Sequence, residues 1–377
     1  MKKNILLLIV FSVFIFLVVE ICFRFFYPQI TQHDNMYEHD EVLGWKFIPN
    51  KKGTIVYPGE AHHSIKINSM GFRDNPLSDD RGEKILVLGD SFVSNISVKD
   101  DDVFTEIMEQ NLVNTSVLNF GVNGYGQVQE YLQLQKWFNV INPDLIISVI
   151  YIRNDFTDNV KDTNWPSSNS IYTRPLALWN EENQEVKLQP VPPPIKEIIS
   201  KPSDRFYHKL HIYHFIRTRI YTIRDRFFKK DESKAYSYTP PELYLCRSEP
   251  STETEVMYKT MERMLFNISN FIKEKRVPIV FAIAPSIVQV EDELWSSVME
   301  NADGSKVTYI RTLPNDKLMA FAKKNNWYMI DLLPELLSET RKGKKLYNPL
   351  EQHWTVEGNH VVSHLLLKYL KDKHLIE

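Results

Sequence analysis

The stretch Lys84-Ile85-Leu86-Val87-Leu88-Gly89-Asp90-Ser91 decides the fold. Its first five residues are almost entirely apolar and end at a glycine, which is typical of a strand buried on both faces in a parallel sheet. Similar runs occupy Ser116–Phe120, Leu145–Ile152, Pro278–Ile283 and Trp327–Leu332. Helical patterns lie between or after them, at Asp102–Leu112, Gln127–Phe138, Glu253–Lys273, Asp316–Lys324 and Glu357–Leu370. This alternation predicts an α/β fold with a doubly wound, mostly parallel five-stranded sheet.

Polar residues follow several of these strands. In doubly wound sheets, ligands bind at the carboxyl ends of the strands, so these residues are the first candidates for a site. Ser91 follows the first strand, and Asn154 follows the third. The second strand leads into Asn119–Gly126, whose three glycines let the backbone turn tightly and approach a ligand. The glycine spacing is not that of a dinucleotide-binding loop.

One histidine lies in a loop of the same kind near the C-terminus. His353 precedes the last predicted helix, which Thr355 is expected to cap. Each feature alone is a weak signal, because turn residues of these types are common. Together, a Ser, a Gly, an Asn and a His are expected at one edge of the sheet.

This pattern resembles the SGNH/GDSL hydrolase family, whose blocks match Gly89-Asp90-Ser91, Gly124, Asn154-Asp155 and His353. The resemblance covers roughly residues 82–160 and 275–372. It implies a flavodoxin-like sheet and an acyl-transfer site. Residues 44–45 and 68–74 also look like those that precede this domain in a membrane-anchored bacterial branch of the family.

The resemblance implies a role for each residue. Ser91 would be the nucleophile and His353 its general base. The Ser91 and Gly124 N–H groups and the Asn154 amide would form the oxyanion hole. The predicted substrate-binding residues are Asp90, Arg153, Asp155 and Trp354.

The sequence departs from the family at two places. Arg153 stands where the family usually has Gly, so it either crowds the pocket or offers substrate a positive charge. Leu350 stands three residues before the histidine, where the family usually has its acid. We therefore assign Glu351 as the triad acid, with Asp331 as the alternative.

The N-terminus predicts the compartment. Lys2 and Lys3 precede an apolar run, Ile5–Val19, that spans about 22 Å as a helix and reaches about 34 Å if continued to Tyr27. No small residues follow it, as a cleavage site would require. We expect an uncleaved signal-anchor over 1–27, held in the membrane through residues 4–27, with the remainder periplasmic or extracellular. An atypical cleaved signal is the alternative.

Two further segments are expected. Residues 28–80 read as a stem with β-like runs at Thr54–Tyr57 and Ser64–Ile67, ahead of a hydrolase-like domain over 81–377. An insert at about 160–250 breaks the β/α rhythm. Within it an apolar stripe predicts an amphipathic helix from Phe206 to Phe227, either packed on the sheet or lying on a membrane or partner.

Composition excludes other classes. The net charge is -3, which gives no case for nucleic-acid binding, and two cysteines cannot build a disulfide scaffold or a Cys-rich metal site. His62 and His63 are adjacent, and His360 and His364 lack an HExxH pattern. No metal site and no cofactor are predicted.

Three functions fit these features. The first is an anchored, exported serine esterase that removes O-acyl groups, acetyl in the first instance, from a carbohydrate or cell-surface polysaccharide. The second is a polysaccharide O-acetyltransferase that uses the same triad. The third is a non-catalytic polysaccharide-binding or assembly protein.

Overall fold

The protein is described by a computed structural model. The structure describes residues 2–26, 35–55, 63–77, 82–161, 165–166, 171–193, 210–213, 215–216, 219, 241–301, 307–349 and 351–377. Its strands are β1 Tyr37–Asp40, β2 Gly44–Phe47, β3 Lys52–Ile55, β4 His63–Lys66, β5 Glu83–Leu88, β6 Thr115–Asn119, β7 Leu145–Tyr151, β8 Trp165–Pro166, β9 Ile171–Tyr172, β10 Leu176–Asn180, β11 Glu185–Gln189, β12 Ile279–Ala284 and β13 Tyr328–Asp331. Its α-helices are α1 Lys2–Phe26, α2 Ser91–Ser94, α3 Phe104–Gln110, α4 Gln127–Ile141, α5 Asp155–Asp158, α7 Pro241–Leu245, α8 Thr252–Lys275, α9 Ile287–Val290, α10 Asp292–Asn301, α11 Leu313–Asn325, α12 Leu333–Arg341 and α13 Val356–Asp372. A 3₁₀ turn, Asp100–Asp102, precedes α3.

The central sheet has five parallel strands in the order β13-β12-β7-β5-β6. The prediction of a doubly wound five-stranded sheet is therefore confirmed. The chain runs outward from β5 to β6, then crosses back to β7 on the other side of β5. The carboxyl ends of β5 and β7 flank this reversal, which is where such sheets bind ligands.

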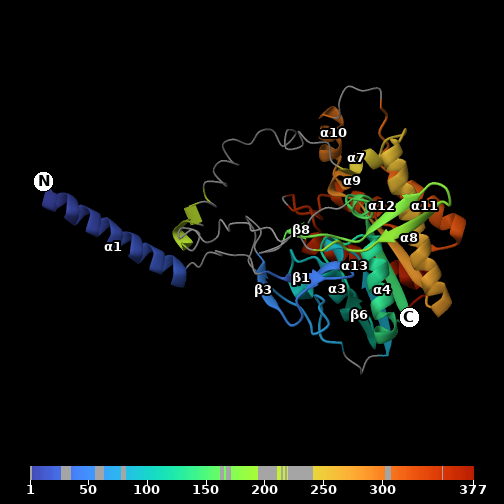
Figure 1. Cartoon of the computed structure of the whole chain (residues 1–377), viewed down its shortest axis with the longest axis horizontal. Helices are drawn as coiled ribbons and strands as arrows, with labels where there is room; N and C mark the ends of the chain where they lie inside the picture. The colour runs from blue at the N-terminus through green and yellow to red at the C-terminus, as the bar shows by residue number, and fades with distance from the viewer. Residues whose placement is uncertain are drawn as a thin grey trace.

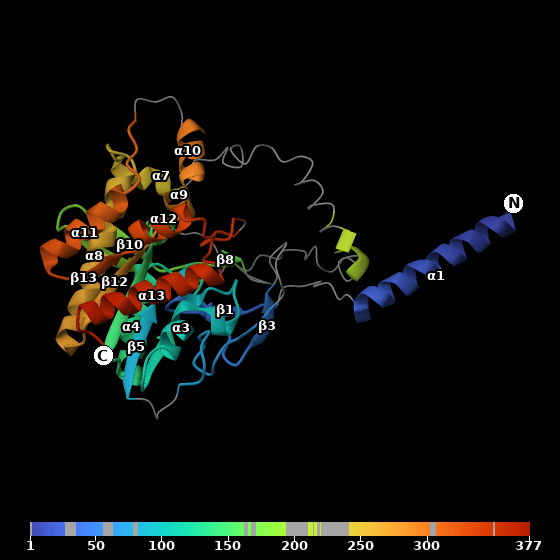
Figure 2. The same ribbon diagram turned by 180° about the vertical axis from the view of Figure 1, so that it is seen from behind.

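Side chains of successive strand residues enter two different cores. In β5, Leu86 and Leu88 join one apolar cluster, and Ile85 and Val87 join the other. This alternation explains why the strands read as continuous apolar runs. Helices α4, α8 and α11 contribute to the first cluster, and α3, α12 and α13 contribute to the second. Figures 1 and 2 show these two helical layers from opposite sides.

The residues before the sheet pack into the same core. Trp45 and Phe47 of β2 and Ile65 of β4 are fully buried in the cluster that contains α4. Phe72 stacks on Phe120, the residue after β6, with ring centroids 3.7 Å apart. The stem is thus part of the packed domain along residues 35–55 and 63–77.

The first part of the insert is built from β-hairpins, β8–β9 and β10–β11, rather than from a helix. The insert is therefore not helical throughout: its β10–β11 hairpin contacts α8, whereas residues 211–213, 215, 216 and 219 of the predicted helix are helical. Most of the predicted Phe206–Phe227 helix lies outside the described residues. Its described parts contact α1, where the Glu20 carboxylate accepts hydrogen bonds from the His211 and Ile212 N–H groups at 3.0 Å.

Helix α1 lies apart from the sheet in both views (Figures 1 and 2). Among the described residues, Asn4–Phe26 is the one stretch long and apolar enough to cross a bilayer, with a mean hydropathy of 3.1. A membrane anchor and a signal sequence both have this length and composition.

One glycine permits the contact between the β6 loop and α2. A Cβ on Gly121 would lie 2.3 Å from Ser94 N and 2.6 Å from Val93 Cβ. The loop after β6 therefore packs directly on the helix that begins at Ser91. The approach brings two segments of the predicted site together.

We expect Gly121→Ala to lower the free energy of unfolding by about 1–3 kcal/mol, because the overpacked backbone must shift. Urea denaturation of the two proteins measures the difference. Gly82→Ala is the matched control, since its Cβ would meet chiefly the movable amide of Asn114. Equal stability of the Gly121 and Gly82 variants would contradict the prediction.

Candidate active site

The turn after β5 presents Ser91 at the start of α2. A Cβ on Gly89 would lie 2.4 Å from Val93 Cγ2, so a larger residue would push the helix off the strand. Asp90 caps the helix by accepting a hydrogen bond from Phe92 N at 2.8 Å. Ser91 is partly exposed, whereas Asp90 beneath it is fully buried. The turn therefore places one hydroxyl at the carboxyl edge of the sheet.

The buried carboxyl group of Asp90 contacts two other predicted site residues. Its Oδ2 lies 3.5 Å from Ser91 Oγ and 3.4 Å from Asn154 Nδ2. Burial raises the pKa of Asp90 to about 6, and the positive charge of a protonated His353 acts against this rise. The His353 ring lies close to this turn, with its centroid 5.2 Å from that of Phe92.

Two backbone N–H groups at this edge are available to an incoming oxygen. Gly124 adopts a φ of +75°, which glycine accommodates without strain. Among the described residues, neither the Gly124 N–H nor the Ser91 N–H donates a hydrogen bond. Donors of this kind are what an oxyanion hole needs.

The Asn154 side chain follows β7 and turns its amide nitrogen toward carboxylates. Nδ2 donates to Asp158 Oδ2 at 2.8 Å, with Asp90 and Asp155 at 3.4 and 3.5 Å. A carboxylate-lined environment fixes which end of the amide faces inward, since an amide oxygen there would be repelled. Although Asn154 is the N-cap residue of α5, its side chain makes no capping bond.

A layer of buried carboxyl groups lies behind Asn154. Asp155 accepts hydrogen bonds from Gln127 Nε2 at 2.7 Å and from Tyr151 N at 2.9 Å. Glu130 accepts from Ser148 Oγ at 2.8 Å. Burial raises the pKa of Glu130 to about 8 and raises the pKa of Asp155, with the neighbouring carboxylates adding to both shifts. Both carboxyl groups accept hydrogen bonds from neighbouring side chains, and burial shifts both toward the protonated form.

His353 and Glu351 lie in a tight turn ahead of α13. Asn348 N donates to His353 O, and Gln352 N donates to Asn348 O, both at 2.8 Å, with Gln352 at a φ of +67°. Glu351 Oε2 lies 3.6 Å from His353 Nδ1 and accepts a hydrogen bond from Ser97 Oγ at 2.6 Å. The His353 ring packs 5.2 Å from Phe92. The turn therefore brings this pair to the nucleophile's helix.

The predicted pair His353 and Glu351 lies close together, but His353 makes no hydrogen bond to either Glu351 or Ser91 among the described residues. Among the described residues, His353 Nδ1 is buried without a hydrogen-bond partner, and no hydrogen bond links His353 to Ser91. Catalytic hydrogen bonds are often long before substrate is bound. Asp331, the alternative acid, accepts instead from Asn315 Nδ2 and Leu333 N at the start of α12.

The structure corrects three of the predicted substrate contacts. Asp90, Asp155 and Trp354 are all 0% exposed. Trp354 is a core residue, with its ring 4.8 Å from Phe92 and edge-on to it. Trp354 and Asp155 support the site from within, and Asp90 lies under Ser91.

Of the four predicted substrate-binding residues, only Arg153 has an accessible side chain, which is 31% exposed. Its Nε lies 3.8 Å from Glu242 Oε2, which is buried in α7. Burial raises the pKa of Glu242, and the Arg153 charge opposes that shift. Sequence analysis missed Glu242 because nothing in the local pattern links α7 to β7.

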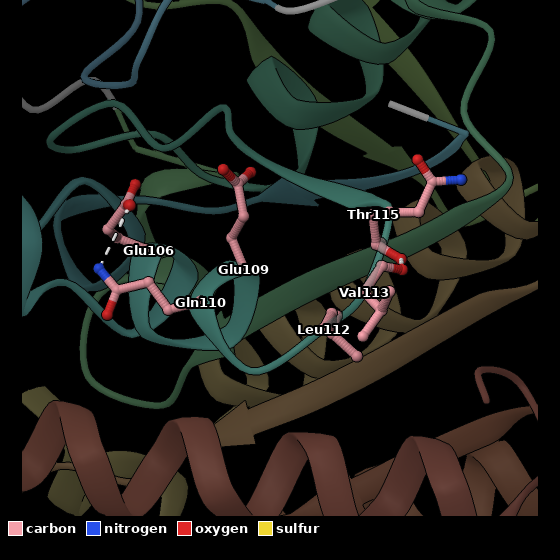
Figure 3. A pocket seen from close by; sticks show the side chains of 7 residues that line it. Glu106, Glu109, Gln110, Leu112, Val113 and Thr115 are labelled. Carbon is pink, nitrogen blue, oxygen red and sulfur yellow. Dashed lines mark hydrogen bonds between the residues drawn. The ribbon is translucent and has the colours of Figure 1, made fainter. Parts of the chain in front are cut away.

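Among the described residues, no group of three His, Cys, Asp or Glu side chains is arranged to hold a metal ion. A surface hollow lies at the start of β6, lined by Glu106, Glu109, Gln110, Leu112, Val113, Asn114 and Thr115 (Figure 3). It is at the amino end of the sheet, opposite Ser91.

The chain is similar to several solved structures. One is a member of the lipolytic G-D-S-L family from Veillonella parvula, with 12% identity, a TM-score of 0.38, and coverage of 76% of this chain and 97% of that one. An acetyl xylan esterase has the same identity and TM-score, with 76% and 98% covered. A catalytic mutant of an acetylxylan esterase from Geobacillus stearothermophilus has 11% identity and a TM-score of 0.35, with 78% and 96% covered. No family model and no curated protein matches the sequence.

The raised pKa of Glu130 gives a testable pH dependence. The folded chain keeps the proton up to about pH 8, whereas the unfolded chain loses it near 4.5. Between these values the folded state binds more protons, so the free energy of unfolding falls as pH rises, by at most about 1.4 kcal/mol per pH unit. Glu130→Gln, which mimics the protonated acid, should flatten this slope.

Urea denaturation across the interval measures the slope. Glu335→Gln, an exposed acid in α12, is the matched control and should keep the wild-type slope. A Glu130→Gln protein whose stability falls with pH as steeply as the wild type would contradict the assignment.

Proposed function

We propose that this protein is a membrane-anchored, exported serine esterase that removes O-acyl groups from a carbohydrate or surface polysaccharide. Acetyl is the acyl group that we expect. One observation carries the proposal. Ser91 follows β5 where the sheet order reverses, its N–H and that of Gly124 donate no hydrogen bond among the described residues, and the His353 ring packs on the adjacent Phe92. Such a cluster is what acyl transfer through a serine requires.

In the proposed mechanism, His353 takes the proton of Ser91 as the oxygen attacks the ester carbonyl. Glu351 fixes the imidazole tautomer and stabilises the imidazolium. The Ser91 and Gly124 N–H groups and the Asn154 amide bind the oxyanion. His353 then protonates the leaving alcohol, and water releases the acyl group from Ser91.

Helix α1 supports the anchored form of this enzyme. The Glu20 carboxylate satisfies two N–H groups of residues 211–212, and Phe23 packs on Phe215 with ring centroids 4.7 Å apart. Cleavage that removed α1 would leave those N–H groups without this acceptor. The helix is therefore suited to remain with the mature chain.

Arg153 is the proposed substrate contact of the site. Glu242 pairs with the Arg153 Nε atom, and the Arg153 side chain is partly exposed to solvent. Arg153 immediately precedes Asn154 in the sequence. We expect it to favour substrates with an acidic group near the acylated hydroxyl, such as a uronate.

We expect a fluorophosphonate probe to label Ser91 of the detergent-solubilised full-length protein, located by mass spectrometry of peptides. Ser91→Ala and His353→Ala should abolish labelling, because one removes the nucleophile and the other its base. Ser296→Ala and His360→Ala, both on the surface, are the matched controls. Absence of labelling in the folded wild-type protein would reject catalysis and favour a binding or assembly role. Faster acyl transfer to a sugar than to water would make the protein an acetyltransferase.

The triad acid is tested by paired amide substitutions. We expect Glu351→Gln to lower kcat for 4-nitrophenyl acetate by about 10²–10⁴-fold, because the imidazolium loses its partner. Asp331→Asn should stay within about threefold of wild type, since Asp331 accepts from Asn315 Nδ2 and Leu333 N and not from His353. The reverse ranking would transfer the role to Asp331.

A further inference from the structure

The orientation of the Asn154 side-chain amide depends on one buried acid, Asp158. Asp158 is 6% exposed and accepts the strongest bond of that amide, 2.8 Å from Nδ2. An amide nitrogen has two hydrogens. Because Asp158 binds one, the second is directed away from it, and the contacts of Nδ2 with Asp90 and Asp155 are long. Asp158 thus sets where the second N–H points.

Asp158 is fixed in turn by an arginine from the insert. Arg174 Nη1 lies 3.0 Å from Asp158 Oδ1 and 3.4 Å from the Asp158 backbone oxygen. Arg174 is 2% exposed, and its guanidinium lies over the Trp45 ring, 5.1 Å from the centroid. A buried ion pair contributes little net stability compared with apolar residues. Within the pair, the Arg174 charge balances the buried Asp158 carboxylate, which binds the Asn154 amide.

Trp45 also contacts the second predicted donor segment. Its Nε1 donates to the backbone oxygen of Asn123, the residue before Gly124, at 3.0 Å. The neighbouring Gly44 allows Thr173 to approach, because a Cβ there would lie 2.1 Å from Thr173 O. The stem and the Thr173–Arg174 segment thus form one support behind both loops.

We propose that Arg174 is a positioning residue for the oxyanion hole, acting through Asp158 on the Asn154 amide while Trp45 braces both Arg174 and the Gly124 loop. This inference rests on the proposed esterase function. Without Arg174, the Asp158 carboxylate loses its ion pair. The orientation of the Asn154 amide, which Asp158 binds, is then no longer fixed. The loss falls on the transition state, where the oxyanion forms, and not on substrate binding.

The test measures kcat and KM for 4-nitrophenyl acetate hydrolysis by the full-length protein in detergent. We expect Arg174→Met to lower kcat about 100-fold and to change KM less than about threefold. Arg174→Lys keeps the charge and should recover most of the loss. Arg263→Met is the matched control, because Arg263 fastens the β10–β11 hairpin through Gln184 O without contacting Asp158, and it should leave kcat unchanged.

A double-mutant cycle with Asn154→Ala separates positioning from general destabilisation. If Arg174 acts through Asn154, the double variant Asn154→Ala/Arg174→Met should be no slower than Asn154→Ala alone. Multiplied effects of the two substitutions would overturn the proposal, and so would a folded Arg174→Met protein with wild-type kcat.

If Arg174→Met does not fold, Asp158→Asn takes its place in the cycle. Asp158→Asn keeps an acceptor for the amide but loses the ion pair, so kcat should fall and the effect should vanish in the Asn154→Ala background. Wild-type kcat in a folded Asp158→Asn protein would overturn the proposal. A wild-type protein with neither turnover nor Ser91 labelling would reject the esterase function itself, and this inference with it.

Discussion

The carboxyl group of Asp90 is the contact on which the arrangement of the site depends. It caps α2, lies within 3.5 Å of Ser91 Oγ, and lies 3.4 Å from the Asn154 amide. It therefore joins the end of β5 to the end of β7. A charge in so buried a position is costly, and the raised pKa of Asp90 expresses that cost. The positive charge of a protonated His353 opposes this rise in the pKa of Asp90, so the loop that contains His353 also interacts with Asp90.

Around this contact, the molecule is organised as successive layers of support. Asp158 and Asp155 lie behind Asn154, Gln127 and Glu130 lie behind Asp155, and Trp45 of the stem lies behind Arg174. Trp354 fills the core beneath Phe92 and His353. The stem and the first part of the insert thus belong to the same packed unit as the sheet. Their contacts are with the loops that carry the candidate site residues.

The sheet was predictable because its signal is local. Each strand is a short apolar run, and the alternation with helices fixes the fold class. The positions of Ser91, Gly124 and Asn154 after strands, and of His353 before the last helix, also predicted that the four residues lie at one edge of the sheet. The supporting residues were not predictable, because Asp158, Arg174 and Glu242 are ordinary charged residues until tertiary contacts bring them together. Trp354 was misassigned since sequence cannot distinguish a loop tryptophan that binds substrate from one that fills a core, and the β10–β11 hairpin was missed.

The contacts of the last loop have a consequence for biosynthesis. Asn95 Nδ2 bonds to Trp354 O across 259 positions of the chain, and His353 is the neighbour of that tryptophan. Contacts so distant in sequence form late, after the nearer elements have folded. The half of the protein that contains Ser91 emerges from the ribosome long before the loop that contains His353. Under the proposed mechanism, a nascent or truncated chain therefore carries an inert serine, and reactivity begins only when synthesis is complete and the final turn has docked.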